Sequence, residues 1–158
     1  TGNLEIGAWA YYPVDNGSSG ANEDDRYSSY PIRELVLGLT DYYFPEGGDL
    51  FNYSDEDGVH FLEASISYSL GNLSLLAGYF FSGDPDNSMY FEAGYALGTY
   101  NGVDASVFAG AGDGVYVSDG TDLSVVNIGV TFSKDALSAS YIINPERETN
   151  YLVFGYSF

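Results

Sequence analysis

The chain has 158 residues, a formal net charge of -19 at pH 7 and no cysteine. Its 23 acidic and four basic residues argue against nucleic-acid binding, because phosphate contacts need clustered Lys and Arg. The lack of cysteine excludes disulfides, thiolate metal sites and thiol nucleophiles. No stretch approaches the roughly 18 consecutive apolar residues of a transmembrane helix, so any spanning structure would be a closed β-barrel.

Sixteen Tyr, ten Phe and twenty Gly favour β-structure. Apolar and polar residues alternate with a period of two in segments where helical spacing is almost absent. In chain order these segments are residues 3–13, 33–44, 59–70, 73–82, 89–97, 103–110, 125–132, 137–143 and 151–158. One face of each segment is apolar, and the other carries Ser, Gly, Thr and Tyr with an occasional acidic residue. That second face suits a crowded, hydrated interior better than the Lys- and Glu-rich exterior of a soluble sheet.

Connection lengths alternate along the chain. From residue 59 onward, short links such as "LGN" and "SKDA" take turns with longer polar or acidic links such as "SGDPDNS" and "GDGVYVSDGTD". Transmembrane β-barrels sort their loops in this way. We therefore predict an all-β fold, an antiparallel transmembrane β-barrel that forms a single domain over residues 1–158. We expect about eight to ten strands, short turns at the periplasmic rim and long acidic loops outside.

The N-terminal part departs from this alternation. Counted back from the C-terminus, the stretch from Val14 to Arg33 falls at the short-turn rim, where a long loop is unexpected. We therefore expect one strand near residues 26–33, and further N-terminal strands, to be missing or truncated. Since no basic and apolar leader opens the sequence, either a signal peptide has been removed or the sequence starts within a longer precursor.

Several strings carry a family resemblance: "LVLGLTDYYFPEGGDLFNY", "HFLEASISYSLGNLSLLAGYFF", "SMYFEAGYALG" and "YLVFGYSF". Over about Glu34 to Phe158 the chain resembles the TorF family of porins, in versions like those of Bacteroidetes. The resemblance implies a bacterial outer-membrane barrel of about twelve strands that contacts lipid and lipopolysaccharide. It also implies insertion through a C-terminal aromatic strand. Leu152, Phe154, Tyr156 and Phe158 would form the membrane-facing side of that strand.

Five acidic residues fall on the polar faces of predicted strands: Glu5, Glu34, Glu63, Glu92 and Asp104. Around an open lumen these carboxylates would make passage cation-preferring, as rings of acidic side chains do. The alternative is that they hydrogen-bond interior Tyr, Ser, Thr and Asn in a plugged barrel, because eight strands leave an interior just filled by side chains.

No pattern predicts an enzyme or a cofactor. His60 is the only histidine, and no G-x-S-x-G string accompanies it, so we predict an interfacial rather than a catalytic histidine. The loops "ANEDD", "SDEDG", "GDPDN" and "SDGTD" carry oxygen ligands of the kind calcium prefers. Solvated loops are one interpretation, and divalent cations that bridge these loops to lipopolysaccharide phosphates are the other.

The sequence thus predicts a porin that lets small solutes or cations pass through a polar, acidic lumen. Two alternatives stay open. One is a non-conducting structural or accessory barrel subunit that binds other envelope proteins, and the other is a soluble, acidic β-sandwich.

Overall fold

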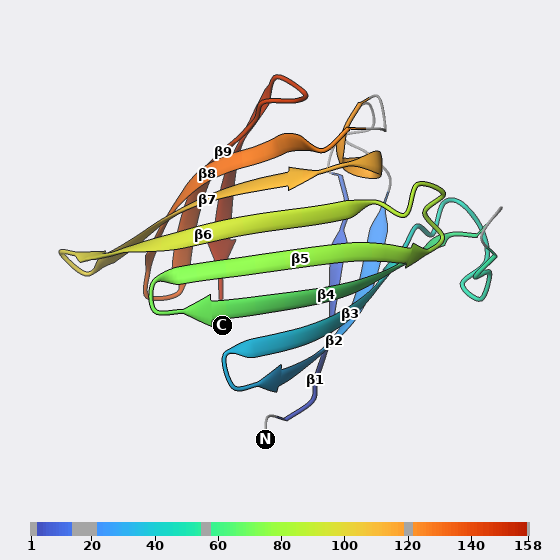
Figure 1. Ribbon diagram of the computed structural model, residues 1–158, viewed down its shortest axis with the longest axis horizontal. Helices are drawn as coiled ribbons and strands as arrows, with labels where there is room; N and C mark the ends of the chain where they lie inside the picture. The colour runs from blue at the N-terminus through green and yellow to red at the C-terminus, as the bar shows by residue number, and fades with distance from the viewer. Residues whose placement is uncertain (1–2, 14–21, 55–57, 119–121, 158) are drawn as a thin grey trace. The chain divides into compact units, whose positions relative to one another are not determined.

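A computed structural model describes residues 3–13, 22–54, 58–118 and 122–157 (Figure 1). Its described residues form an all-β protein, with one antiparallel sheet of ten strands in the order β1 to β10. The strand number lies within the predicted range. The elements are β1 (Glu5–Tyr11), β2 (Glu23–Ile32), β3 (Leu35–Tyr43), β4 (His60–Leu70), β5 (Leu73–Ser82), β6 (Met89–Tyr100), β7 (Val103–Gly112), the 3-10 helix η1 (Gly114–Tyr116), β8 (Ser124–Lys134), β9 (Leu137–Asn144) and β10 (Thr149–Tyr156). None of the described residues lies in a helix long and apolar enough to cross a membrane.

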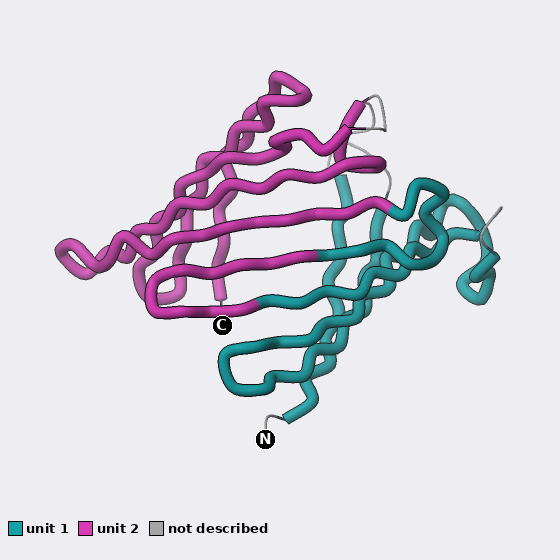
Figure 2. Tube along the Cα trace, in the orientation of Figure 1, with its two compact units in different colours: residues 1–67, 78–87 teal, residues 68–77, 88–158 magenta. Residues whose placement is uncertain are grey.

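The chain divides into two compact units (Figure 2). Unit 1 comprises residues 1–67 and 78–87, and unit 2 comprises residues 68–77 and 88–158. Strands β4 and β5 therefore contribute to both units.

In unit 1, strand register separates two faces. Gly7 of β1 lies opposite Tyr27 of β2, which lies opposite Thr40 of β3. Side chains of directly opposed residues share a face of the sheet, so these positions belong to what we call the polar face. The neighbouring row begins with Ile6 and ends with Leu39, and it belongs to the apolar face.

Unit 2 repeats the same separation over five strands. One directly paired row consists of apolar residues alone: Tyr95, Val107, Val130, Tyr141 and Leu152. The adjacent row on the polar face consists mainly of small and hydroxylated residues: Ala96, Ser106, Thr131, Ser140 and Val153. The predicted alternation of the two faces is therefore present in the pairing itself.

Two-residue turns alternate with longer connections throughout the chain. The short turns are residues 33–34, 71–72, 101–102 and 135–136. Each has a residue with positive φ at its first position, between 52° and 61°, as tight hairpin turns of the primed types require. Gly, Asn and Asp supply this conformation more readily than other residue types, whereas the turn at residues 33–34 has Arg33 there, at φ 61°.

Strand β2 corrects one prediction. The strand expected to be missing near residues 26–33 is present as the ten-residue β2, paired with both β1 and β3. Its apolar-face positions include Arg26 and Ser28, so its alternation is weak in sequence. With β2 in place, the connection that begins after Tyr11 joins the longer set, and the irregularity in loop lengths disappears.

Two β-bulges modify the alternation in unit 2. The register between β7 and β8 passes from Asn127 to Val125 and skips Val126, while the β6–β7 register skips Leu97. Val126 is consequently buried and Val125 is exposed, which reverses the faces predicted for these two valines. Bulges re-aim side chains in this way, and simple alternation cannot predict them.

Burial does not follow hydrophobicity in the described residues. Among the described residues, the buried hydrophobic side chains are only Val59, Phe80, Val117 and Val126. The buried polar set includes Asp25, His60, Glu63, Asp84 and Ser88. Many large apolar side chains of the apolar face are exposed instead, Leu39, Tyr95 and Phe132 among them.

Candidate functional site

The polar face carries carboxylates that are held by neighbouring residues. Glu63 on β4 is buried, and its carboxylate lies over Gly78 of β5. A β-carbon at position 78 would come within 2.8 Å of Glu63 Oε2, so the missing side chain makes room for the charge. This niche holds the carboxylate on the polar face of unit 1.

In unit 2, two of the acidic residues predicted to lie on the polar faces, Glu92 and Asp104, accept hydrogen bonds. Tyr90 donates its hydroxyl to Glu92 Oε2 at 2.5 Å, and Asn127 Nδ2 donates to the Tyr90 oxygen at 2.6 Å. The Thr99 hydroxyl donates to Asp104 across the bulged end of the hairpin. These are the contacts expected if the carboxylates are bound by interior polar groups.

Of the other two acidic residues predicted on the polar faces, Glu5 lies on a strand and Glu34 does not. Glu5 lies on the polar face of β1, opposite Ser29, and is exposed. Glu34 is not on a strand, because it is the second residue of the turn between β2 and β3. Its assignment to a strand face is wrong, since the predicted segment 33–44 began inside the turn.

Sequence alternation missed two carboxylates on β2. Glu23 and Asp25 occupy the polar face, opposite Tyr11 and Trp9 of β1. Asp25 is only 7% exposed. A weak signal was present in the alternation of Glu23, Asp25 and Tyr27, but no apolar residues alternated with them. Unit 1 therefore has more acid on its polar face than predicted.

A second polar cluster lies at the end of the apolar face in unit 1. Along this face, β3 presents Leu35, Leu37 and Leu39, and then Asp41 and Tyr43. Arg26 lies directly opposite Asp41 on β2. The apolar stretch of this face therefore ends after Leu39.

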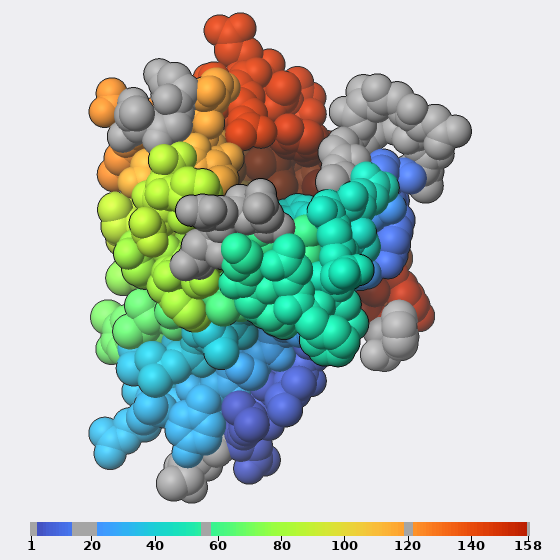
Figure 3. Space-filling view, turned by 90° about the vertical axis from the view of Figure 1, so that its right-hand side faces the viewer, coloured from blue at the N-terminus to red at the C-terminus, as the bar shows by residue number. Residues whose placement is uncertain are grey.

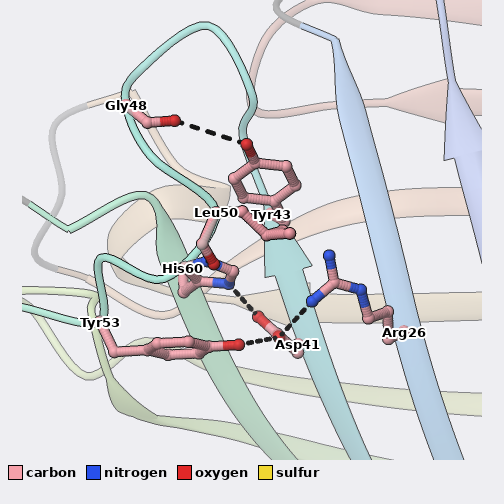
Figure 4. A network of polar contacts seen from close by, with 7 residues as sticks. All are labelled: Arg26, Asp41, Tyr43, Gly48, Leu50, Tyr53 and His60. Carbon is pink, nitrogen blue, oxygen red and sulfur yellow. Dashed lines mark hydrogen bonds and ion pairs between the residues drawn. The ribbon is translucent and has the colours of Figure 1, made fainter.

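His60, the first residue of β4, is at the centre of this cluster (Figure 4). Its side chain is fully buried, with Nδ1 2.6 Å from Asp41 Oδ1 and Nε2 2.8 Å from the Leu50 carbonyl oxygen. A carbonyl oxygen only accepts, so Nε2 donates to Leu50, while Nδ1 makes the contact with the Asp41 carboxyl. Both ring nitrogens are thus engaged. The ring is buried because the β3–β4 connection covers it, and the interfacial position of His60 stays a prediction.

Aromatic stacking completes the cluster. The His60 ring lies between the rings of Tyr53 and Tyr43, with centroid distances of 3.9 and 4.8 Å. Tyr53 also donates its hydroxyl to Asp41 at 3.0 Å. Burial, and then this hydrogen bond, raise the pKa of Tyr53, which keeps the phenol protonated as a donor.

Arg26 closes the network from β2. Its guanidinium lies 3.6 Å from Asp41 Oδ2 and 5.7 Å from the centre of the Tyr43 ring. The β3–β4 connection, which supplies Leu50 and Tyr53, lies at the surface (Figure 3, turquoise). His60 and Asp41 therefore fix part of this long connection to the ends of β3 and β4.

The acidic loops show no metal geometry in the described residues, where no group of three or more His, Asp or Glu could hold an ion. In the "GDPDN" loop, Asp84 is buried and accepts a hydrogen bond from the Asp86 amide at 3.2 Å, as in a self-capped turn. Residue 21 of "ANEDD", residues 55–57 of "SDEDG" and residues 119–121 of "SDGTD" lie outside the described residues. Divalent cations at these loops stay a prediction.

On β10, the side chains of Leu152, Phe154 and Tyr156 share one face, and each is more than 60% exposed. Phe158 lies outside the described residues. Comparisons with protein-family models, curated proteins and solved structures found no match to this chain.

Proposed function

We propose that this chain is an outer-membrane β-barrel of the porin type, which lets small solutes and cations pass through a polar, acidic lumen. The observation that carries the proposal is the inverted polarity: apolar rows are exposed, while Asp25, Glu63 and His60 are buried. In water, exposed rows of this extent would favour aggregation, whereas acyl chains accept them. The resemblance to TorF-type porins supports the same location.

A lipid environment would also require the sheet to close into a barrel. Strands β1 and β10 are the two ends of the strand order. An open sheet edge exposes unpaired amide and carbonyl groups, which cost several kcal/mol each in lipid. We therefore propose that β1 pairs with β10. The resulting barrel would have ten strands, an even number, as is common in bacterial single-chain barrels.

Selectivity for cations would come from the polar face. Glu5, Glu63, Glu92 and Asp104, with Glu23 and Asp25, place carboxylates on strands of both units. Rings of acidic side chains favour cations in pores. Ten strands also enclose a wider interior than the eight that side chains just fill.

The His60 cluster would lie where the apolar band meets water. The three leucines of β3 give way to Asp41, and the clustered charges are covered by the β3–β4 connection. This arrangement fits the outer rim, where acidic loops would face lipopolysaccharide and its divalent cations.

The test is reconstitution of the full chain. We expect extraction only with detergent, slower migration after heating in gel electrophoresis, and conductance in planar bilayers. With a KCl gradient across the bilayer, the reversal potential should have the sign of a cation-selective pore. Extraction without detergent, or an anion-selective reversal potential, would contradict the proposal.

One observation favours the non-conducting alternative. The hydrogen-bonded chain from Asn127 through Tyr90 to Glu92, and the ring of Phe108 over Gly129, occupy space on the polar face of unit 2. A heat-modifiable, membrane-inserted protein that never conducts would support an accessory barrel that binds other envelope proteins.

A further inference from the structure

A hollow of about 370 Å³ opens on the polar face of unit 2, at the end where the longer connections meet the strands. Small-molecule sites typically start near this size, at roughly 300 Å³. Its lining consists of Tyr90, Val115, Tyr116, Val126, Asn127, Asn144 and Arg147. The hollow therefore combines two aromatic rings with two amides and a guanidinium.

Two connections form its roof, and hydrogen bonds join them to each other. Arg147, in the β9–β10 turn, donates from Nη2 to the Val115 carbonyl oxygen at 3.2 Å. The neighbouring Glu146 accepts the Ser118 amide at 2.8 Å through Oε1. The roof is thus a built structure, with side chains of the β9–β10 turn holding the β7–β8 connection.

The 3-10 helix η1 is itself fixed to the strands below. Ser88 is almost completely buried, and its Oγ accepts the Val115 amide at 2.9 Å. Tyr116 packs over Gly112, where a β-carbon would come within 2.8 Å of its ring. These contacts place the Tyr116 ring 5.2 Å from that of Tyr90, between centroids.

The floor contains an acceptor without a donor. The bulge at Val126 brings Val126 and Asn127 together in the lining of the hollow. Asn127 uses Nδ2 to donate to Tyr90, but its Oδ1 atom is buried and has no partner. The atom lies over Gly110 and is covered, so it meets a ligand hydroxyl only when the Asn127 amide turns toward the hollow. An unsatisfied buried acceptor is costly, which favours that turn.

The one charged residue in the lining, Arg147, is already paired with Glu146 at 3.6 Å. Glu92 lies outside the lining and accepts the Tyr90 hydroxyl. The hollow therefore offers neutral hydrogen-bonding groups and aromatic rings rather than a free charge. This chemistry suits a ligand rich in hydroxyl groups and without net charge.

We propose that this hollow binds a small, neutral, polyhydroxylated solute, a mono- or disaccharide. The Asn127 amide turns toward the hollow and its Oδ1 accepts a ligand hydroxyl, the Arg147 guanidinium donates to a ligand oxygen, and the apolar face of a sugar ring packs on Tyr116. The inference deepens the proposed function, on which it rests, because it names a solute class for the same polar face.

The test measures binding of D-glucose and maltose to the full chain in detergent micelles, by isothermal titration calorimetry and by amide chemical shifts. We expect saturable binding in roughly the millimolar range, with shifts at Asn127, Tyr116 and Arg147. Asn127→Leu should weaken it by about tenfold or more. Thr131→Val, on the same face of β8, removes a hydroxyl outside the hollow and should leave affinity unchanged.

If Asn127→Leu does not fold, Arg147→Gln serves as a second variant. It changes a residue in an exposed turn and should also weaken binding. The absence of saturable binding for both sugars, or undiminished binding by a folded Asn127→Leu or Arg147→Gln protein, would overturn the inference. Saturable binding of sodium glutamate or lysine at the same residues, in place of the sugars, would also overturn it. Binding in micelles needs no conductance, so a porin that binds no sugar and a sugar-binding protein that does not conduct are distinguishable.

Discussion

His60 and Asp41 join the start of β4 to the end of β3 through a 2.6 Å hydrogen bond, and the His60 ring stacks on the rings of Tyr43 and Tyr53. The other ring nitrogen of His60 binds the Leu50 carbonyl in the connection between these strands. One side chain therefore fixes two strand ends and a loop.

Replacement of His60 by Leu should release this loop without unfolding the strands. The change removes both ring hydrogen bonds, each worth roughly 1 kcal/mol and more where Asp41 is charged. Cleavage by chymotrypsin at Phe51 or Tyr53 should therefore accelerate by about tenfold or more, while heat-modifiable migration persists. The matched variant Tyr53→Phe loses only one hydroxyl and should accelerate cleavage less. Equal cleavage of His60→Leu and the parent would show that the network does not hold the loop.

Neutralising Glu63 should reduce cation selectivity. Glu63→Gln removes one buried charge from the polar face of β4, so the reversal potential in a KCl gradient should move toward zero. Glu34→Gln removes the same charge from the two-residue turn between β2 and β3 and provides the matched control. A larger effect from Glu34 than from Glu63 would contradict the assignment of these positions.

The hydrogen bond between Ser118 of the β7–β8 connection and Glu146 of the β9–β10 turn should be lost at acid pH. The hydrogen bond from the Ser118 amide, helped by Arg147, holds the pKa of Glu146 below its usual range. A lowered pKa means that the contact stabilises the fold above the ordinary carboxyl pKa, near 4.3, and is lost as pH falls through the lower folded value. The Ser118 amide chemical shift should therefore titrate at a pH below the ordinary carboxyl pKa. In Glu146→Gln it should not, and a shift that titrates equally in both proteins would refute the contact.

If the sheet closes, two cysteines introduced on the first and last strands should form a disulfide. The chain has no cysteine of its own, so a disulfide in a double variant can only join the two introduced residues. Trp9→Cys combined with Tyr151→Cys or Val153→Cys places both thiols on polar-face positions of β1 and β10. We expect at least one pair to form a disulfide, because paired residues on adjacent strands have Cα atoms within the range of about 4.4–6.8 Å that a disulfide needs. Trp9→Cys with Ser106→Cys of β7 is the control that should stay reduced, and failure of both β1–β10 pairs would argue for an open sheet.

The faces of the sheet were largely predictable from the sequence, because the period of two is fixed by strand geometry. The row that contains Val107, Val130 and Tyr141 appears in the alternation and again in the register. Strand β2 was not predictable in this way, since Arg26 and Ser28 occupy its apolar face. Their partners, Asp41 and Leu39, are distant in sequence and become evident only when the strands pair.

The clusters were less predictable than the faces. Acidic positions on strands, such as Glu63 and Glu92, could be predicted from alternation, but Glu34 could not, because a turn boundary shifted by two residues. The burial of His60 depends on a loop folding back over it, and the hollow at Asn127 depends on a bulge at Val126. Neither the loop contact nor the bulge has a signal in local sequence.

Labelling of single cysteines along β8 tests the central claim, that the polar face encloses water and the apolar face meets lipid. In lipid vesicles, Thr131→Cys and Ser133→Cys should react quickly with a charged, water-soluble maleimide, while Val130→Cys and Phe132→Cys should be protected. In each pair the residue on the polar face is the reactive one. Rapid labelling of positions 130 and 132, with protection of 131 and 133, would contradict the claim and indicate a soluble sheet.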